Sequence, residues 1–123
     1  MLISFKVTGL PVSYNKHFQI IWSLKQCQLS PEAHAYKNRV KLSIPPVEID
    51  DDKSLSIEVD YHYNFYYKNG KLKKIDSANC DKILYDAISE RLGIDDSLFK
   101  TRLVHDYHNE KESFVEVRID KIE

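Results

Sequence analysis

The sequence has few cysteines, no long apolar run and no excess of charge of either sign. Its 2 cysteines, Cys27 and Cys80, lie far apart, whereas a structural zinc ion needs clustered ligands at short spacing. No apolar stretch is long enough to span a bilayer, and Met1 is followed at once by a strand-like pattern instead of a secretory leader. We therefore expect a reduced, cytoplasmic protein with no membrane partner.

The charge balance limits how the chain could bind nucleic acid. Charged residues make up 30% of the sequence, yet the formal net charge is only −1. A protein that grips DNA by charge alone is normally basic, so binding would need a local basic patch. At 123 residues and 42% apolar content, we expect a single domain over residues 1–123 with a modest core, which a dimer would enlarge.

The first half of the sequence carries strand and helix signals in turn. Apolar and polar residues alternate over 3–8, which predicts a strand that ends before Gly9. One or two short strands are expected within 11–29. Ser30 as N-cap and Pro31 in the first turn predict a helix, which a proline pair ends. The buried stripe of this helix is predicted to be Ala33, Tyr36, Val40 and Ile44.

A long central hairpin is the clearest element. Apolar and aromatic residues occupy every second position over 55–67, which predicts a strand with one buried face. An Asn-Gly pair at 69–70 predicts a two-residue turn that places Tyr67 opposite Leu72 and carries Asp76 onto the buried face. A lone carboxylate there needs a partner or a metal ion. A β-bulge would reverse the faces, and Asp76 or its neighbour could instead cap the next helix.

The second half completes an α/β (α+β) domain with a mixed sheet and two main helices. A helix is predicted over Asn79–Leu92 with Gly93 as its stop, followed by strands near 98–105 and 113–120. We expect the tyrosine row of the long strand to belong to the core and not to form a base-stacking surface. The histidines expected at the surface are His62, His105 and His108.

The stretch DSANCDKILYDAI (residues 76–88), followed by GIDD (93–96), resembles the core signature of the RusA-type Holliday-junction resolvases. These crossover junction endodeoxyribonucleases are a family of small phage and prophage enzymes. Their signature is Asp-x-Asp-Asn, a Lys three residues on, an Asp-Ala pair, and an Asp-Asp pair after the helix. GLPVSYNK and LSPEAHAYKNRV resemble earlier family segments, so the resemblance covers roughly residues 9–120. The signature falls here on Asp76, Asn79, Lys82, Asp86, Ala87, Gly93, Asp95 and Asp96.

The resemblance implies a homodimeric, Mg²⁺-dependent endonuclease of DNA recombination and repair, associated with the nucleoid. It implies paired symmetric nicks in four-way DNA junctions, with Mn²⁺ as an alternative ion. The implied metal ligands are Asp76, Asp96 and Asp95, and the implied catalytic residues are Asp76, Lys82 and Asp96. Asn79 would cap the helix or orient a ligand. Ala78 stands where the family has its second acid, and the candidates to replace that acid are Asp95, Asp81, Asp60 and Glu58.

Two other functions stay open at this level. A chain that lacks one family acid could hold branched DNA and cut it poorly or not at all. A protein-interaction domain would fit the net charge of −1. Lys82 and Asp86 could form only a surface ion pair, and the Asp-Asp pair could be only a solvated loop. The basic residues predicted to contact DNA are Lys16, Lys73, Lys74 and Arg102.

The length of the second helix bears on how the acids could meet. Residues 79–92 would form a helix of about 20 Å, with Asp76 just before it and Asp96 just after it. Both flanking segments would have to double back for the two carboxylates of one chain to approach each other. We therefore expect Asp76 and Asp96 of different subunits to form each metal site, with a shorter or bent helix as the competing explanation.

Overall fold

A computed structural model describes residues 3–10, 18–21, 26–49, 53–74 and 81–122. The mixed α+β class with two main helices is confirmed. Among the described residues, no helix is long and apolar enough to cross a membrane. The elements in chain order are β1 (Ile3–Thr8), β2 (Phe18–Ile21), β3 (Gln26–Leu29), α1 (Pro31–Ser43), β4 (Leu55–Tyr63), α2 (Asp81–Leu92), the 3-10 turn η4 (Asp96–Leu98), β5 (Phe99–His108) and β6 (Phe114–Lys121).

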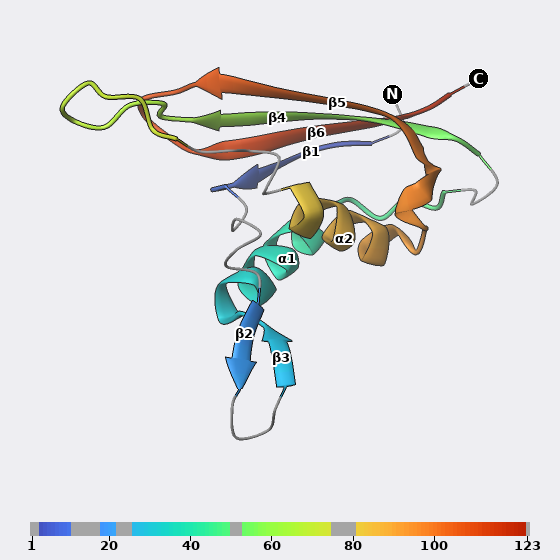
Figure 1. Cartoon of the computed structure of the whole chain (residues 1–123). Helices are drawn as coiled ribbons and strands as arrows, with labels where there is room; N and C mark the ends of the chain where they lie inside the picture. Colours follow the sequence, from blue (N-terminus) through green and yellow to red (C-terminus); the bar gives the residue numbers. More distant parts are fainter. Residues whose placement is uncertain (1–2, 11–17, 22–25, 50–52, 75–80, 123) are drawn as a thin grey trace.

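One four-stranded mixed sheet organises the molecule, with the strand order β1-β6-β4-β5. β4 is antiparallel to β6 and parallel to β5, whereas β2 and β3 form a separate two-stranded hairpin. Both helices lie on one side of the sheet, and the β2–β3 hairpin lies beyond them (Figure 1). Because parallel strands need a crossover, α2 returns the chain from the end of β4 to the start of β5.

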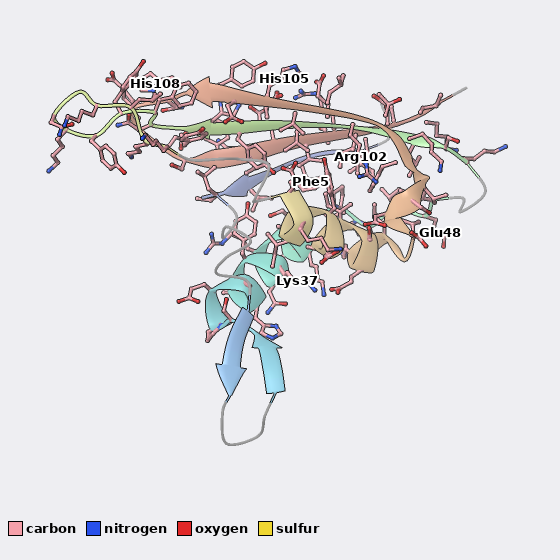
Figure 2. All side chains as sticks on the ribbon, in the orientation of Figure 1. Phe5, Lys37, Glu48, Arg102, His105 and His108 are labelled. Carbon is pink, nitrogen blue, oxygen red and sulfur yellow. The ribbon has the colours of Figure 1, made fainter. Side chains whose placement is uncertain are left out.

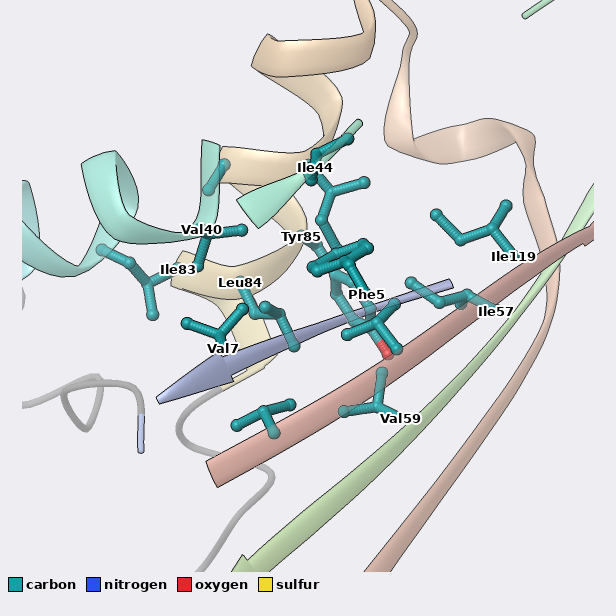
Figure 3. Close-up of a cluster of buried hydrophobic side chains, with 14 of the residues drawn as sticks. Phe5, Val7, Val40, Ile44, Ile57, Val59, Ile83, Leu84, Tyr85 and Ile119 are labelled. Carbon is teal, nitrogen blue, oxygen red and sulfur yellow. The ribbon is translucent and has the colours of Figure 1, made fainter. Parts of the chain in front are cut away.

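The hydrophobic core lies between the sheet and the two helices (Figure 3). β1, β4 and β6 bury every second side chain on the helix-facing side, as alternation predicts. β5 differs, because every residue after Phe99 in this edge strand is exposed. The helices therefore cover three strands of the sheet and leave β5 open. The most deeply buried core side chains include Val7, Val40, Leu55, Ile57, Val59, Tyr61, Ile83, Leu84, Ile88, Val115 and Ile119.

The helix α1 begins and packs as its sequence predicts. The Ser30 hydroxyl accepts a hydrogen bond from the Ala33 amide at 3.2 Å, which satisfies one of the unpaired donors of the first turn. The predicted stripe is buried, including Ile44 just beyond the helix. On the other side, Glu90 of α2 accepts from Lys37 and Lys41, each at 2.6 Å, and joins the two helices.

The hairpin after β4 is shorter than predicted. β4 ends at Tyr63, and beyond it Tyr66 pairs with Leu72 in a single bridge. The Gly70 amide donates to the Tyr67 carbonyl at 2.9 Å, and Gly70 adopts a φ of 84°. The loop therefore has one residue more than a two-residue turn, and the predicted pairing of Tyr67 with Leu72 is wrong by one position. The prediction that Asp76 lies on the buried face depended on that pairing, so it no longer has support.

The sheet itself explains why the hairpin stays short. β4 is already hydrogen-bonded to β6 along one edge and to β5 along the other. The last residue of β5 pairs with Tyr63 and the first residue of β6 pairs with His62, so no described strand flanks the chain further on. Tyr67, predicted to be buried, is consequently 57% exposed, whereas Tyr61 and Tyr63 are buried as predicted.

The end of α2 fixes the position of the Asp-Asp pair. Gly93 has a φ of 68°, a left-handed conformation, and the Ile94 amide donates to the Ser89 carbonyl at 3.1 Å. This is the bond that typically closes a helix ending in glycine, so the predicted stop is confirmed. The predicted start at Asn79 lies outside the described residues, and the described helix begins at Asp81.

Candidate active site

The residues that the sequence singles out divide between the two ends of α2. Lys16, Asp76 and Asn79 lie outside the described residues, so their predicted roles are untested. Lys82 lies in the first turn of the described helix, and the Asp95–Asp96 pair lies just beyond its last turn. The described part of the site therefore has two halves, one at each end of the helix.

At the beginning of α2, the buried Tyr61 holds Asp81, which the sequence analysis gave as one candidate to replace the missing family acid. Tyr61 is 1% exposed, and its hydroxyl donates to the Asp81 carboxylate. One turn further on, burial and the negative charge of Asp81 raise the pKa of Tyr85 to about 12, so its phenol stays protonated. Asp81 is thereby fixed at the helix start, half-buried, with two tyrosine side chains beside its carboxylate.

Lys82 makes the surface ion pair that the sequence left open. Its Nζ lies 3.0 Å from the Asp86 carboxylate one turn along; the Lys82 side chain is largely exposed and that of Asp86 partly so. A pair of this kind stabilises a helix by only about 0.3 kcal/mol. The pairing with Asp86 therefore contributes little to the stability of the helix.

At the other end of the helix, Asp95 has a structural role. Its carboxylate accepts from the Ser97 amide at 2.9 Å and caps the short η4 turn. The backbone and hydroxyl donors of Ser97 hold the pKa of Asp95 below its usual value. Asp95 therefore stabilises the turn that carries Asp96.

Arg102, predicted to contact DNA, is occupied by the backbone of this turn. Its guanidinium donates to the Asp96 carbonyl at 3.1 Å and to the Phe99 carbonyl at 3.2 Å. It also lies over the Tyr85 ring, 5.4 Å from the centroid. Figure 2 shows it on the side of the sheet that faces the helices. These contacts tie Arg102 to the turn that carries Asp96, and its predicted contact with DNA stays a prediction.

The two ends of α2 lie far apart when measured along β4. Asp81 is held by Tyr61, whereas η4 leads directly into Phe99, which pairs with Leu55. Tyr61 and Leu55 are six residues apart on one strand, which corresponds to about 20 Å. Lys82 and Asp96 of one chain are therefore not brought together.

Two of the acids considered as replacements for the one missing at Ala78 belong to the opposite face of the sheet. Arg118 donates to Glu58 at 2.8 Å and to Asp60 at 2.7 Å, and His105 lies 3.2 Å from Asp60. These carboxylates raise the pKa of the Arg118 guanidinium, which keeps the guanidinium charged. Glu58 and Asp60 are thus committed to the outer face, and Asp81 is the remaining acid next to the family signature.

The chemistry of the acids present fits Mg²⁺, which prefers carboxylate and water oxygens and commonly takes one or two carboxylates from a protein. Within the described segments, no three acidic, histidine or cysteine side chains are grouped closely enough to hold a metal ion.

A mixed α+β domain with carboxylates and a lysine at the ends of one helix has the groups of a metal-assisted phosphodiesterase. Comparison with known families identifies it further. The chain belongs to the RusA endodeoxyribonuclease family, whose model, Endodeoxyribonuclease RusA, matches residues 11–120. Membership implies endonuclease action on Holliday junctions and confirms the resemblance found in the sequence. No curated protein matches the chain significantly.

Proposed function

We propose that the protein is a homodimeric, Mg²⁺-dependent endonuclease that cuts four-way DNA junctions by paired symmetric nicks. The observation that carries this proposal is the separation of Lys82 and Asp96, which lie at the two ends of α2, about 20 Å apart. Two chains related by a two-fold axis would bring unlike ends together and create two equivalent sites. A pair of equivalent sites suits a junction with two-fold symmetry.

Each side chain has a chemical role in this proposal. Asp76 and Asp96 would hold the ion, either Mg²⁺ or Mn²⁺, which when bound polarises the scissile phosphate and lowers the pKa of a water. Lys82 would leave Asp86 and neutralise charge that develops on the phosphate. Asn79 would orient a ligand, and Asp95 would hold the turn that carries Asp96.

A mixing experiment tests whether each site is shared between subunits. Asp76→Asn and Asp96→Asn are each expected to abolish cleavage of a labelled four-way junction. In a mixed dimer of the two variants, a shared site keeps one intact pair of aspartates, so nicking of one strand should return. If Asp76 and Asp96 of the same chain form the site, every site in the mixture is damaged and no activity returns.

Asp81 is proposed to supply the carboxylate that the family has at the position of Ala78. It lies three residues after Ala78, and its hydrogen bond from Tyr61 holds it at the helix start. Asp81→Asn should weaken Mn²⁺ binding by about 10-fold in calorimetry. Asp86→Asn, which changes an exposed acid of the same helix, serves as the matched control and should bind Mn²⁺ normally. Equal binding by both variants and the wild type would exclude Asp81 as a ligand.

The second candidate function is junction binding without cleavage, which Ala78 favours because one family acid is missing. A fixed four-way junction and a linear duplex of matched sequence separate the two functions. Paired nicks on the junction alone, dependent on Mg²⁺ and lost in Asp76→Asn, support the nuclease. Junction binding in a chelator, with no cleavage in Mg²⁺ or Mn²⁺, supports the binding module.

A basic patch is proposed to hold the DNA despite the near-neutral net charge. Lys16, Lys73 and Lys74 are its members, and Lys74 is exposed while Lys73 is half-buried. Replacing Lys73 and Lys74 together by Ala should lower the slope of log affinity against log salt by about 2. Lys6, which pairs with Glu112 at 3.8 Å on the outer face, is the control lysine, and Lys6→Ala should leave the slope unchanged.

A further inference from the structure

The tip of the hairpin after β4 exposes two tyrosine rings. The tip, residues 64–74, extends past the ends of the sheet strands (yellow-green in Figure 1). Tyr66 is 44% exposed and Tyr67 is 57% exposed, whereas Tyr61 and Tyr63 of the same row are buried. An aromatic ring gains little by lying in water, so two adjacent exposed rings call for a partner with an aromatic or apolar surface.

These rings are held in place by their surroundings. The Tyr66 ring meets His108 edge to face, with centroids 5.2 Å apart, and its amide donates to the Asn64 side chain at 2.9 Å. The Phe65 amide donates to His108 Nδ1 at 3.1 Å. Lys73 Nζ lies 5.8 Å from the Tyr67 ring centroid. A partner that binds here therefore meets a preformed surface. Binding then costs less conformational entropy, because the side chains of the tip are already ordered.

Positive charge surrounds the rings. The tip has no acidic residue and carries Lys68, Lys71, Lys73 and Lys74. The rings also border a hollow of about 390 Å³, lined by Asn64, Tyr66, Tyr67, Lys68, Lys73 and Glu110. Aromatic faces among lysines, next to a hollow, are the combination that binds a nucleotide through its base and its phosphates together.

We propose that Tyr66 and Tyr67 stack on a DNA base that is unstacked at the branch point of the junction, while the lysines of the tip hold the flanking phosphates. This inference rests on the proposed function, because it names the part of the junction that the tip contacts. In a continuous duplex each base is covered on both faces by its neighbours. Only a discontinuity such as a branch point offers a free base face, so this contact distinguishes a junction from linear DNA.

Fluorescence of 2-aminopurine tests the contact in the presence of a chelator, so that no cleavage intervenes. The base analogue is placed at the branch point of one junction and in the middle of an arm of another. Wild-type protein should change the fluorescence at the branch point and leave the arm position unchanged. Tyr66→Leu and Tyr67→Leu, made separately, should each reduce this change and weaken junction binding by about 5- to 100-fold. Duplex affinity and the salt slope should stay constant.

The controls separate stacking from other effects. Tyr66→Phe and Tyr67→Phe keep the ring and should bind as the wild type does. Tyr107→Leu removes a ring of β5 that is 45% exposed and stacks on His62, not on a residue of the tip, and should also bind normally. Junction and duplex binding that weaken equally in the leucine variants would overturn the inference, as would no weakening in either. If the leucine variants lose as much affinity for a single-stranded oligonucleotide as for the junction, the partner is single-stranded DNA in general. That result would also overturn the inference.

The same measurements separate this inference from the proposed function. If the wild type does not prefer the junction over the duplex, the proposed function fails. If the wild type prefers the junction and the leucine variants keep that preference unchanged, only the stacking contact is wrong.

Discussion

At the scale of the single residue, Arg102 binds the backbone of the turn that follows α2. Its charge predicted a phosphate contact, yet the guanidinium bonds to the carbonyl groups of Asp96 and Phe99. Those carbonyl groups point toward Arg102 only because η4 forms a tight turn, and local pattern does not predict the orientation of backbone groups across such a turn. The fixed position of Asp81 could not be predicted for a similar reason, because the hydrogen bond that it accepts from Tyr61 joins residues 20 positions apart.

A pair of variants distinguishes a positioning role from a phosphate contact. Arg102→Ala should destabilise the protein by about 1 to 2 kcal/mol, because it removes two hydrogen bonds from a charged donor. It should reduce cleavage while leaving the salt slope of junction binding unchanged. Lys74→Ala is the matched control and should lower that slope by about 1 with no loss of stability. A lower slope for Arg102→Ala would return Arg102 to the DNA-contacting set.

At the scale of the element, periodicity predicted which faces are buried better than where elements end. Alternation in β4 is correct through Tyr63 and misleading beyond it, because the neighbouring strands stop there. The helix ends were predictable, since Ser30 and Gly93 act through their own local geometry. The exposure of β5 was not predictable, because it depends on how far two helices reach across a sheet.

Gly93 makes the end of α2 testable. Its φ of 68° is strained for other residues, although an added Cβ would meet no atom within 4 Å. Gly93→Ala should therefore destabilise the protein by about 1 kcal/mol through backbone strain alone. Gly93→Asn should lose less, because asparagine tolerates this conformation better. Urea denaturation measures both variants, and an alanine variant as stable as the wild type would contradict the argument.

The ion pairs between α1 and α2 predict that the stability of the protein depends on pH. Hydrogen bonds from Lys37 and Lys41 lower the pKa of Glu90 below its ordinary value of 4.5. A lowered pKa in the folded state contributes stability above the unfolded value, and this contribution is lost as the pH falls through the folded pKa. Because Glu90 is partly exposed, Glu90→Gln should cost no more than about 0.5 kcal/mol at pH 7. Thermal unfolding should show the difference at pH 7 and none in strong acid; a constant difference would contradict it.

At the scale of the whole molecule, the two faces of the sheet differ in what they contact. The outer face carries Arg118, Glu58, Asp60 and His105 in mutually paired contacts, and His105 lies on the side away from the helices (Figure 2). The other face supports the helices and the candidate site. The composition shows only a near-neutral net charge. The fold shows that opposite charges pair on the outer face, whereas lysines gather at the tip.

This separation predicts that stability and function can be changed independently. Asp60 is 7% exposed and paired with Arg118 and His105, so Asp60→Asn should destabilise the protein by about 1 to 3 kcal/mol. Junction affinity, measured well below the melting temperature, should equal that of the wild type. A loss of junction affinity in the folded variant would mean that the outer face takes part in binding.

The crossover formed by α2 also bears on how the length of this chain can change. Residues added to the β2–β3 hairpin or between β5 and β6 would leave both ends of α2 where they are. One extra turn in α2 would move Asp96 by about 5.4 Å relative to Lys82 and would change the spacing of the two cuts in the proposed dimer. Insertions and deletions should therefore be tolerated in these two connections and not in α2, whose length sets the distance between Lys82 and Asp96.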